Sequence, residues 1–122
     1  MSAFNWFDTE RKAFDLRTKN LTTKSGNTTY TARTGRAADN FVIDRVIRVT
    51  TTSTYSMVIT VPNGVYYGQQ LLVLFEVEGG TETVTTSVAK GENITSLEAA
   101  GSWSILIWLG STLGWDEMAK GE

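Results

Sequence analysis

The chain has 122 residues and a formal net charge of −2, a size that corresponds to one domain with its own hydrophobic core. It contains neither cysteine nor histidine, which excludes disulfides, thiolate metal sites and any catalysis that depends on a histidine base. Its apolar runs are all much shorter than the roughly 20 residues of a membrane-spanning helix, so we expect no membrane partner.

The first 16 residues combine aromatic side chains with charged ones. Phe7, Arg11 and Phe14 fall on one helical stripe, although an extended arm fits the pattern equally well. So short a segment cannot bury its own aromatic rings, and we therefore expect it to dock on another surface. The candidate contact residues are Phe4, Trp6, Phe7, Arg11, Lys12, Phe14 and Arg17.

Residues 18–40 are polar and have no sustained apolar period. Runs of this length without a pattern are uncommon inside a compact domain. We therefore predict that residues 1–40 form an N-terminal arm or linker that becomes ordered on a partner. A short edge strand around Tyr30 and Ala32 is an alternative for part of this segment.

Residues 41–49 and 55–61 predict the first two strands of a β-rich body. The first stretch is rich in β-branched side chains, although Val42, Val46 and Val49 also fit a helical stripe. The second stretch alternates with period two and places four side chains on one face: Tyr55, Met57, Ile59 and Val61.

Residues 71–78 are apolar on both faces at their start, which is typical of a central strand. Gly79-Gly80 then predicts a two-residue hairpin turn, whose register places Phe75 opposite Val84. The predicted core consists of Leu71, Val73, Phe75, Val84, Val88, Ile105 and Ile107.

The stretch 102–115 holds three of the four tryptophans. Residues 102–109 alternate with period two, which predicts a strand, and the glycine-bounded turn 110–114 returns Trp115 beside Trp108. A buried closing strand is one interpretation, and a ring that contacts a partner is the other. The candidate oligomer or ligand surface consists of Tyr66, Tyr67, Trp108 and Trp115.

Five or more short strands separated by turn signals predict an all-β fold. We expect a small β-sandwich or barrel of antiparallel strands with an extended N-terminal arm. The expected organisation is an arm over residues 1–40, a β-sandwich or barrel body over 41–116 and a flexible tail over 117–122.

Basic residues are concentrated at the front of the chain, where residues 1–48 hold nine of the eleven Lys and Arg residues. The remainder is acidic, and this asymmetry is suited to head-to-neighbour association. The scattered basic residues and a pI near 5.1 argue against a nucleic acid partner.

The pattern of polar residues does not indicate catalytic chemistry. The serines have no histidine to activate them, and neither a calcium loop nor a phosphate loop is present in the sequence. We therefore expect no enzyme activity, no cofactor and no metal site.

Residues 45–115 resemble a β-rich module of small structural proteins of tailed bacteriophages. The resemblance is carried by the runs Val61-Pro62-Asn63-Gly64, Tyr67-Gly68-Gln69 and Ser102-Trp103-Ser104, and by the closing pair Gly114-Trp115. Such modules occur in capsid decoration (cement) proteins and in fibre or tail-spike tips, and such proteins are usually trimers. Leu109 departs from the pattern, because an Asp or Asn often precedes the following glycine.

The resemblance implies a virion structural protein that is assembled in the host cytoplasm and decorates the phage head as a trimer. Its expected partners are the major capsid protein and other copies of itself. Two alternatives remain open at this stage. One is a tail- or head-fibre module that binds a host-surface glycan, and the other is a cellular carbohydrate-binding domain.

Overall fold

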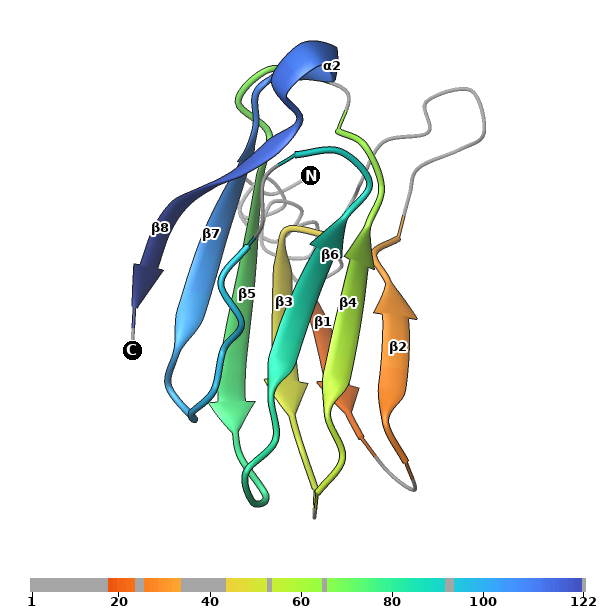
Figure 1. Ribbon diagram of the computed structural model, residues 1–122, viewed down its shortest axis with the longest axis vertical. Coiled ribbons are helices and arrows are strands. Elements are labelled where there is room, and N and C mark those ends of the chain that lie inside the picture. The colour runs from red at the N-terminus through yellow and green to blue at the C-terminus, as the bar shows by residue number, and fades with distance from the viewer. Residues whose placement is uncertain are drawn as a thin grey trace, which may run out of the picture.

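Strands dominate the part of the chain that the structure, a computed structural model, describes: residues 18–23, 26–33, 44–52, 54–64, 66–91 and 94–121. These residues form eight strands and one four-residue helix (Figure 1). The elements are β1 (Thr18–Thr22), β2 (Thr28–Thr31), β3 (Val46–Thr50), β4 (Met57–Val61), β5 (Gln70–Val77), β6 (Val84–Val88), β7 (Trp103–Trp108), α2 (Gly110–Leu113) and β8 (Trp115–Gly121). The prediction of an all-β fold is confirmed.

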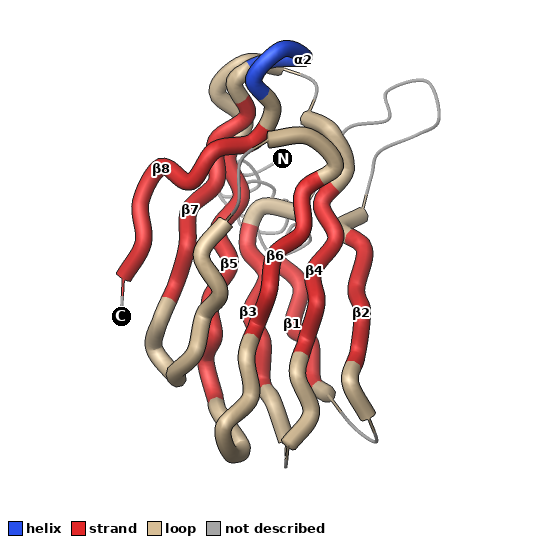
Figure 2. Tube along the Cα trace, viewed as in Figure 1, coloured by secondary structure: helices blue, strands red, loops and turns tan. Residues whose placement is uncertain are grey.

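The strands form two facing sheets, a five-stranded one in the order β1-β3-β5-β7-β8 and a three-stranded one in the order β2-β4-β6 (Figure 2). From β1 to β6, each strand lies in the opposite sheet from the one before it. The chain therefore winds in three coils, β1–β2, β3–β4 and β5–β6, like a flattened β-solenoid. The hairpin β7–β8 then extends the five-stranded sheet beyond β5.

The prediction of antiparallel strands is wrong for most of the body. β1, β3 and β5 pair in parallel, and so do β2, β4 and β6. Among the named pairs, only β5–β7 and β7–β8 are antiparallel. The predicted hairpin at Gly79-Gly80 is instead an arch, since β5 and β6 lie in different sheets. Phe75 and Val84 are both fully buried, but as members of one core between the sheets.

The predicted domain boundaries are also corrected. β1 and β2 lie within the expected arm, yet they pair with β3 and β4, and Leu21 and Tyr30 pack against the core. Pairing with β3 and β4 provides hydrogen-bond partners for the backbone N–H and C=O groups of these polar strands, so the strands can form with few apolar residues. The expected flexible tail is also wrong, because residues 117–121 belong to β8 and pair with β7.

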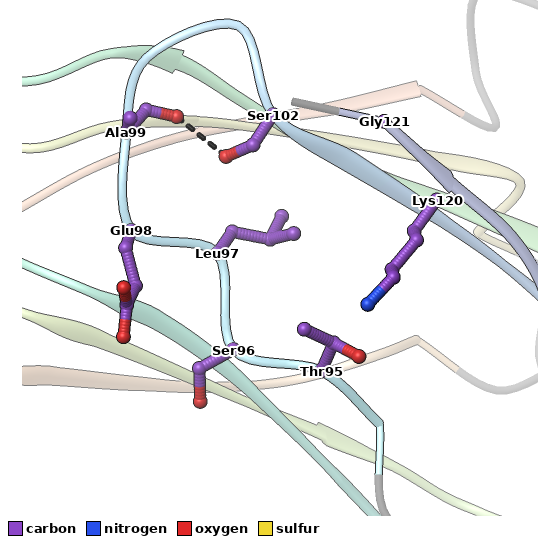
Figure 3. Close-up of a pocket in the computed structure, with 8 residues that line it drawn as sticks. All are labelled: Thr95, Ser96, Leu97, Glu98, Ala99, Ser102, Lys120 and Gly121. Carbon is purple, nitrogen blue, oxygen red and sulfur yellow. Dashed lines mark hydrogen bonds between the residues drawn. The ribbon is translucent and has the colours of Figure 1, made fainter.

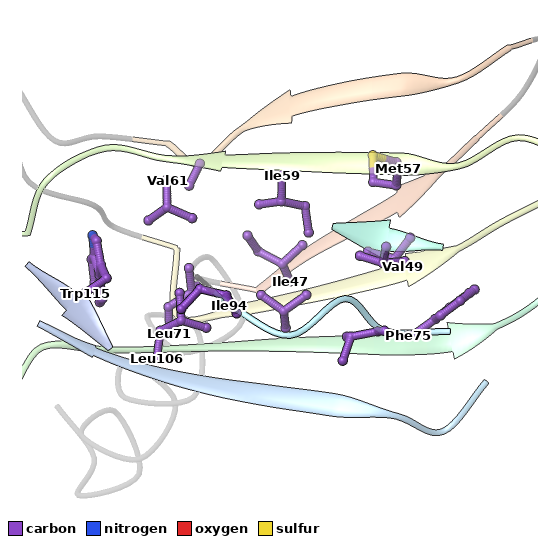
Figure 4. Packing of buried hydrophobic residues seen from close by; sticks show 14 of the residues in the cluster. Ile47, Val49, Met57, Ile59, Val61, Leu71, Phe75, Ile94, Leu106 and Trp115 are labelled. Atoms are coloured by element: carbon purple, nitrogen blue, oxygen red, sulfur yellow. The ribbon is translucent and has the colours of Figure 1, made fainter. Parts of the chain in front are cut away.

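The hydrophobic core lies between the two sheets, where side chains from β4 point toward those of β3 and β5 (Figure 4). Four predicted core residues are fully buried: Leu71, Val73, Phe75 and Val84. Val88 is partly buried and packs against them. The prediction that Ile105 and Ile107 belong to the core is wrong, because β7 turns Leu106 and Trp108 inward instead.

Candidate functional site

The two tryptophans proposed as surface residues are in the core. Trp108 and Trp115 are 3% and 0% exposed, and their rings meet edge to face with centroids 5.5 Å apart. The indole N–H of Trp115 donates to the carbonyl oxygen of Pro62 at 2.8 Å, which satisfies its polar atom. Neither of these two rings is available to a partner, whereas Trp103 of the same strand is partly exposed.

Tyr66 and Tyr67, in contrast, are 57% and 76% exposed. They lie on a turn that is fixed to β7, since the N–H of Gly68 donates to the carbonyl of Trp108 and the N–H of Trp108 donates to the carbonyl of Gln69, each at 2.8 Å. The helix α2 lies at the same end of the body (Figure 1). These two tyrosines therefore form a rigidly supported aromatic tip.

The outward side of the five-stranded sheet carries a patch of apolar side chains on its three middle strands. We call this surface the apolar face; it consists of Val46, Leu72, Leu74, Trp103, Ile105 and Ile107, all partly exposed. The strand register places Val46 beside Leu72, Leu72 beside Ile105, and Leu74 beside Trp103. The six side chains thus form one continuous surface.

The outward side of the three-stranded sheet has the opposite chemistry. We call it the hydroxyl face; it consists of Thr29, Thr31, Val58, Thr60, Thr85 and Ser87. The register forms two rows across the sheet, each with one residue from β2, β4 and β6. Val58, which is 36% exposed, is the one large apolar residue of this face.

A cavity of about 380 Å³ with both polar and apolar walls lies between β8 and the segment that precedes β7 (Figure 3). Leu97 forms part of its lining, and the amine of Lys120 extends toward Thr95. Glu117 of β8 connects β8 to the segment that precedes β7, because its carboxylate accepts a hydrogen bond from the hydroxyl of Thr95 at 2.8 Å. It also accepts one from the hydroxyl of Ser104 in β7, at 2.8 Å. The cavity could accommodate a small hydroxylated or anionic molecule.

A buried carboxylate, Asp44, has a structural role. Its oxygens accept hydrogen bonds from the hydroxyl of Tyr30 at 2.6 Å, the backbone N–H of Arg33 at 2.8 Å and Nε of Arg33 at 2.6 Å. Burial and the hydrogen bond to Asp44 raise the pKa of Tyr30 well above its ordinary value. These three donors come from β2 and from Arg33, which follows it, so among the described residues the contacts of Asp44 join β2 to the start of β3.

Within the described ranges, no group of three acidic residues could hold a metal ion, and no helix is long and apolar enough to cross a membrane. The predicted arm contacts, Phe4, Trp6, Phe7, Arg11, Lys12, Phe14 and Arg17, all lie outside the described residues. Sequence reasoning missed the apolar face, although the apolar residues on both sides of β5 and β7 were its signal.

The chain has no match among the known protein-family models or the curated proteins with which it was compared. The fold, the two contrasting outer faces and the aromatic tip are therefore the observations on which a function can be proposed.

Proposed function

We propose that this protein is a virion structural protein that decorates the head of a tailed bacteriophage as an oligomer. The observation that carries the proposal is the contrast between the apolar face and the hydroxyl face of one small body. A continuous apolar surface favours contact with protein, whereas a surface of hydroxyl groups is compatible with water. A decoration protein needs both, since it lies between an assembly and the solvent.

In this proposal the body forms a trimer on the particle surface, and the segment before β1 attaches it to the major capsid protein. The aromatic residues of that segment, among them Trp6 and Phe7, would provide most of the affinity. The basic residues Arg11 and Lys12 would accelerate the encounter with an acidic shell surface. Folding and assembly would take place in the host cytoplasm before the particle is released.

The test is co-sedimentation of the protein with undecorated heads. Deleting residues 1–16 should abolish attachment while the thermal unfolding of the body stays unchanged, because β1 begins at Thr18. The double variant Trp6→Ala/Phe7→Ala should lose most of the attachment. The matched control is Tyr66→Ala/Tyr67→Ala, which also removes two neighbouring aromatic rings and should attach normally. Full attachment of the deletion variant would contradict the role of the segment.

A second candidate function, a fibre module that binds a host-surface glycan, is favoured by the aromatic tip. Tyr66 and Tyr67 are exposed on an anchored turn, so a sugar ring can stack on them without ordering a loop. Binding to purified host surface glycans should then fall at least tenfold in Tyr67→Ala. Undiminished binding in Tyr66→Ala/Tyr67→Ala, or no glycan binding by the unaltered protein, would exclude this function.

A further inference from the structure

We infer that the apolar face is the surface through which copies of this chain associate. The inference rests on the proposed function in one respect, since it identifies the interface of the oligomer that decoration requires. The tryptophan at this interface is Trp103, the largest side chain of the apolar face. Trp108, which the sequence suggested as a contact residue, is buried.

The first argument compares the two outer faces of the same molecule. A sheet with one solvated side alternates apolar side chains inward and polar ones outward. The three-stranded sheet follows that rule with its rows of threonine and serine. The five-stranded sheet breaks it over part of β3, β5 and β7, where six outward residues are Val, Leu, Ile or Trp, next to the polar outward residues Arg48 and Glu76. A protein surface, not water, is therefore the expected neighbour of the apolar face.

The second argument concerns the rim of the apolar face. The outward residues of β1 are the uncharged Thr18, Asn20 and Thr22. The ion pair Arg48–Glu76 borders Leu74, since Arg48 pairs with Leu74 and Glu76 lies two residues further along β5; Nε of Arg48 donates to Oε2 of Glu76 at 2.8 Å. A polar rim around an apolar centre is the usual anatomy of a protein–protein interface.

The third argument identifies a second copy as the partner. The β3 side of the apolar face carries the exposed Arg45, whereas on the β8 side Asp116 pairs with Ile107 and points outward. A second copy placed with its β8 over β3 brings Asp116 of one copy toward Arg45 of the other, and this head-to-tail contact is the kind that can close into a ring. A recess of about 200 Å³, lined in part by Val46, Leu72 and Ile105, can receive an apolar side chain from that copy.

The decisive experiment compares two charge insertions on opposite sides of the body. Leu74 lies on the apolar face and Val58 lies on the hydroxyl face, each at an outward position of a strand with neighbours on both sides. In sedimentation velocity at micromolar concentration, the unaltered protein and Val58→Glu should both be oligomers. Leu74→Glu should be a monomer, with unchanged circular dichroism.

If Leu74→Glu fails to fold, Ile105→Thr supplies the test, because a β-branched residue retains the strand and should still weaken association about tenfold or more. The inference is overturned if the unaltered protein is a monomer or if both apolar-face variants associate normally. Co-sedimentation with heads separates the two proposals. If the Leu74→Glu monomer still attaches to heads, both the decoration proposal and the proposed interface stand. If the unaltered protein is an oligomer that never attaches to heads, only the decoration proposal is contradicted.

Discussion

Arg33 and Asp44 lie on either side of residues 34–43 and are joined by two hydrogen bonds, from the backbone N–H and from Nε of Arg33, at 2.8 and 2.6 Å. Asp44 is 1% exposed, and the hydroxyl of Tyr30 is its third donor. Arg33 follows β2 and Asp44 precedes β3, so this cluster connects the first coil of the solenoid to the second.

Asp44→Ala should destabilise the body by about 2–3 kcal/mol, because the substitution leaves the hydroxyl of Tyr30 and the guanidinium of Arg33 without their acceptor. Equilibrium unfolding in urea measures the loss. Glu98→Ala is the matched control, since Glu98 is an exposed carboxylate outside the apolar face. A loss below about 0.5 kcal/mol in Asp44→Ala would contradict a structural role for this carboxylate.

The same cluster predicts a dependence of stability on alkaline pH. Burial and the bond to Asp44 raise the pKa of Tyr30 above the value of about 10 expected in the unfolded chain. The stabilisation is complete below pH 10 and is lost as the pH rises above it, because only the unfolded chain then releases the proton. Thermal unfolding between pH 9 and about 11.5 should show a steeper decline than in Tyr30→Phe. Equal slopes for the two proteins would disprove the assignment.

Phe75→Ala should cost on the order of 3–5 kcal/mol, since Phe75 is fully buried between the sheets and its removal leaves a cavity. Urea denaturation provides the measurement, and Tyr67→Ala, which removes a ring that is 76% exposed, should change stability by less than about 0.5 kcal/mol. A cost below about 1 kcal/mol for Phe75→Ala would place Phe75 outside the core.

Gly114→Ala should destabilise more than Gly101→Ala, although both glycines have positive φ angles, of 77° and 92°. The difference is space: a Cβ at Gly114 would collide with the carbonyl of Lys90, whereas a Cβ at Gly101 meets nothing within 4 Å. We expect a cost of about 1 kcal/mol at Gly101 and at least twice that at Gly114. Equal melting temperatures for the two variants would contradict the close approach of Lys90 to the turn before β8.

The strands that sequence reasoning placed correctly are those with one clear apolar period. In β4, Met57, Ile59 and Val61 alternate with Val58 and Thr60 and match the buried positions, and in β5 Leu71 and Phe75 do so. Period two reports which side chains share a face of a strand. It does not report the sheet to which the next strand belongs, so the arch at Gly79-Gly80 could not be distinguished from a hairpin.

The errors have the same origin. In β7 both sides are apolar near the end, so the pattern alone could not tell whether Ile107 or Trp108 points inward. Trp108 points inward, where its ring contacts Trp115 of the neighbouring strand β8, and that contact forms only in the folded protein. β1 and β2 were missed because pairing with β3 and β4, and not their own hydrophobicity, holds them in place.

The winding of the chain has a consequence for how proteins of this shape can vary. Thr18, Val46 and Leu72 occupy equivalent positions in successive coils, and so do Thr28, Met57 and Val84. A duplicated coil could therefore be inserted between two existing ones while both of its neighbours retain their hydrogen-bonding partners. An insertion between the first two coils would lengthen the body by one strand spacing, about 4.8 Å, and leave unaltered both the tyrosine turn, which connects β4 to β5, and the hairpin β7–β8. The length of the body would therefore change by whole coils, and not by single residues, as such a chain evolves.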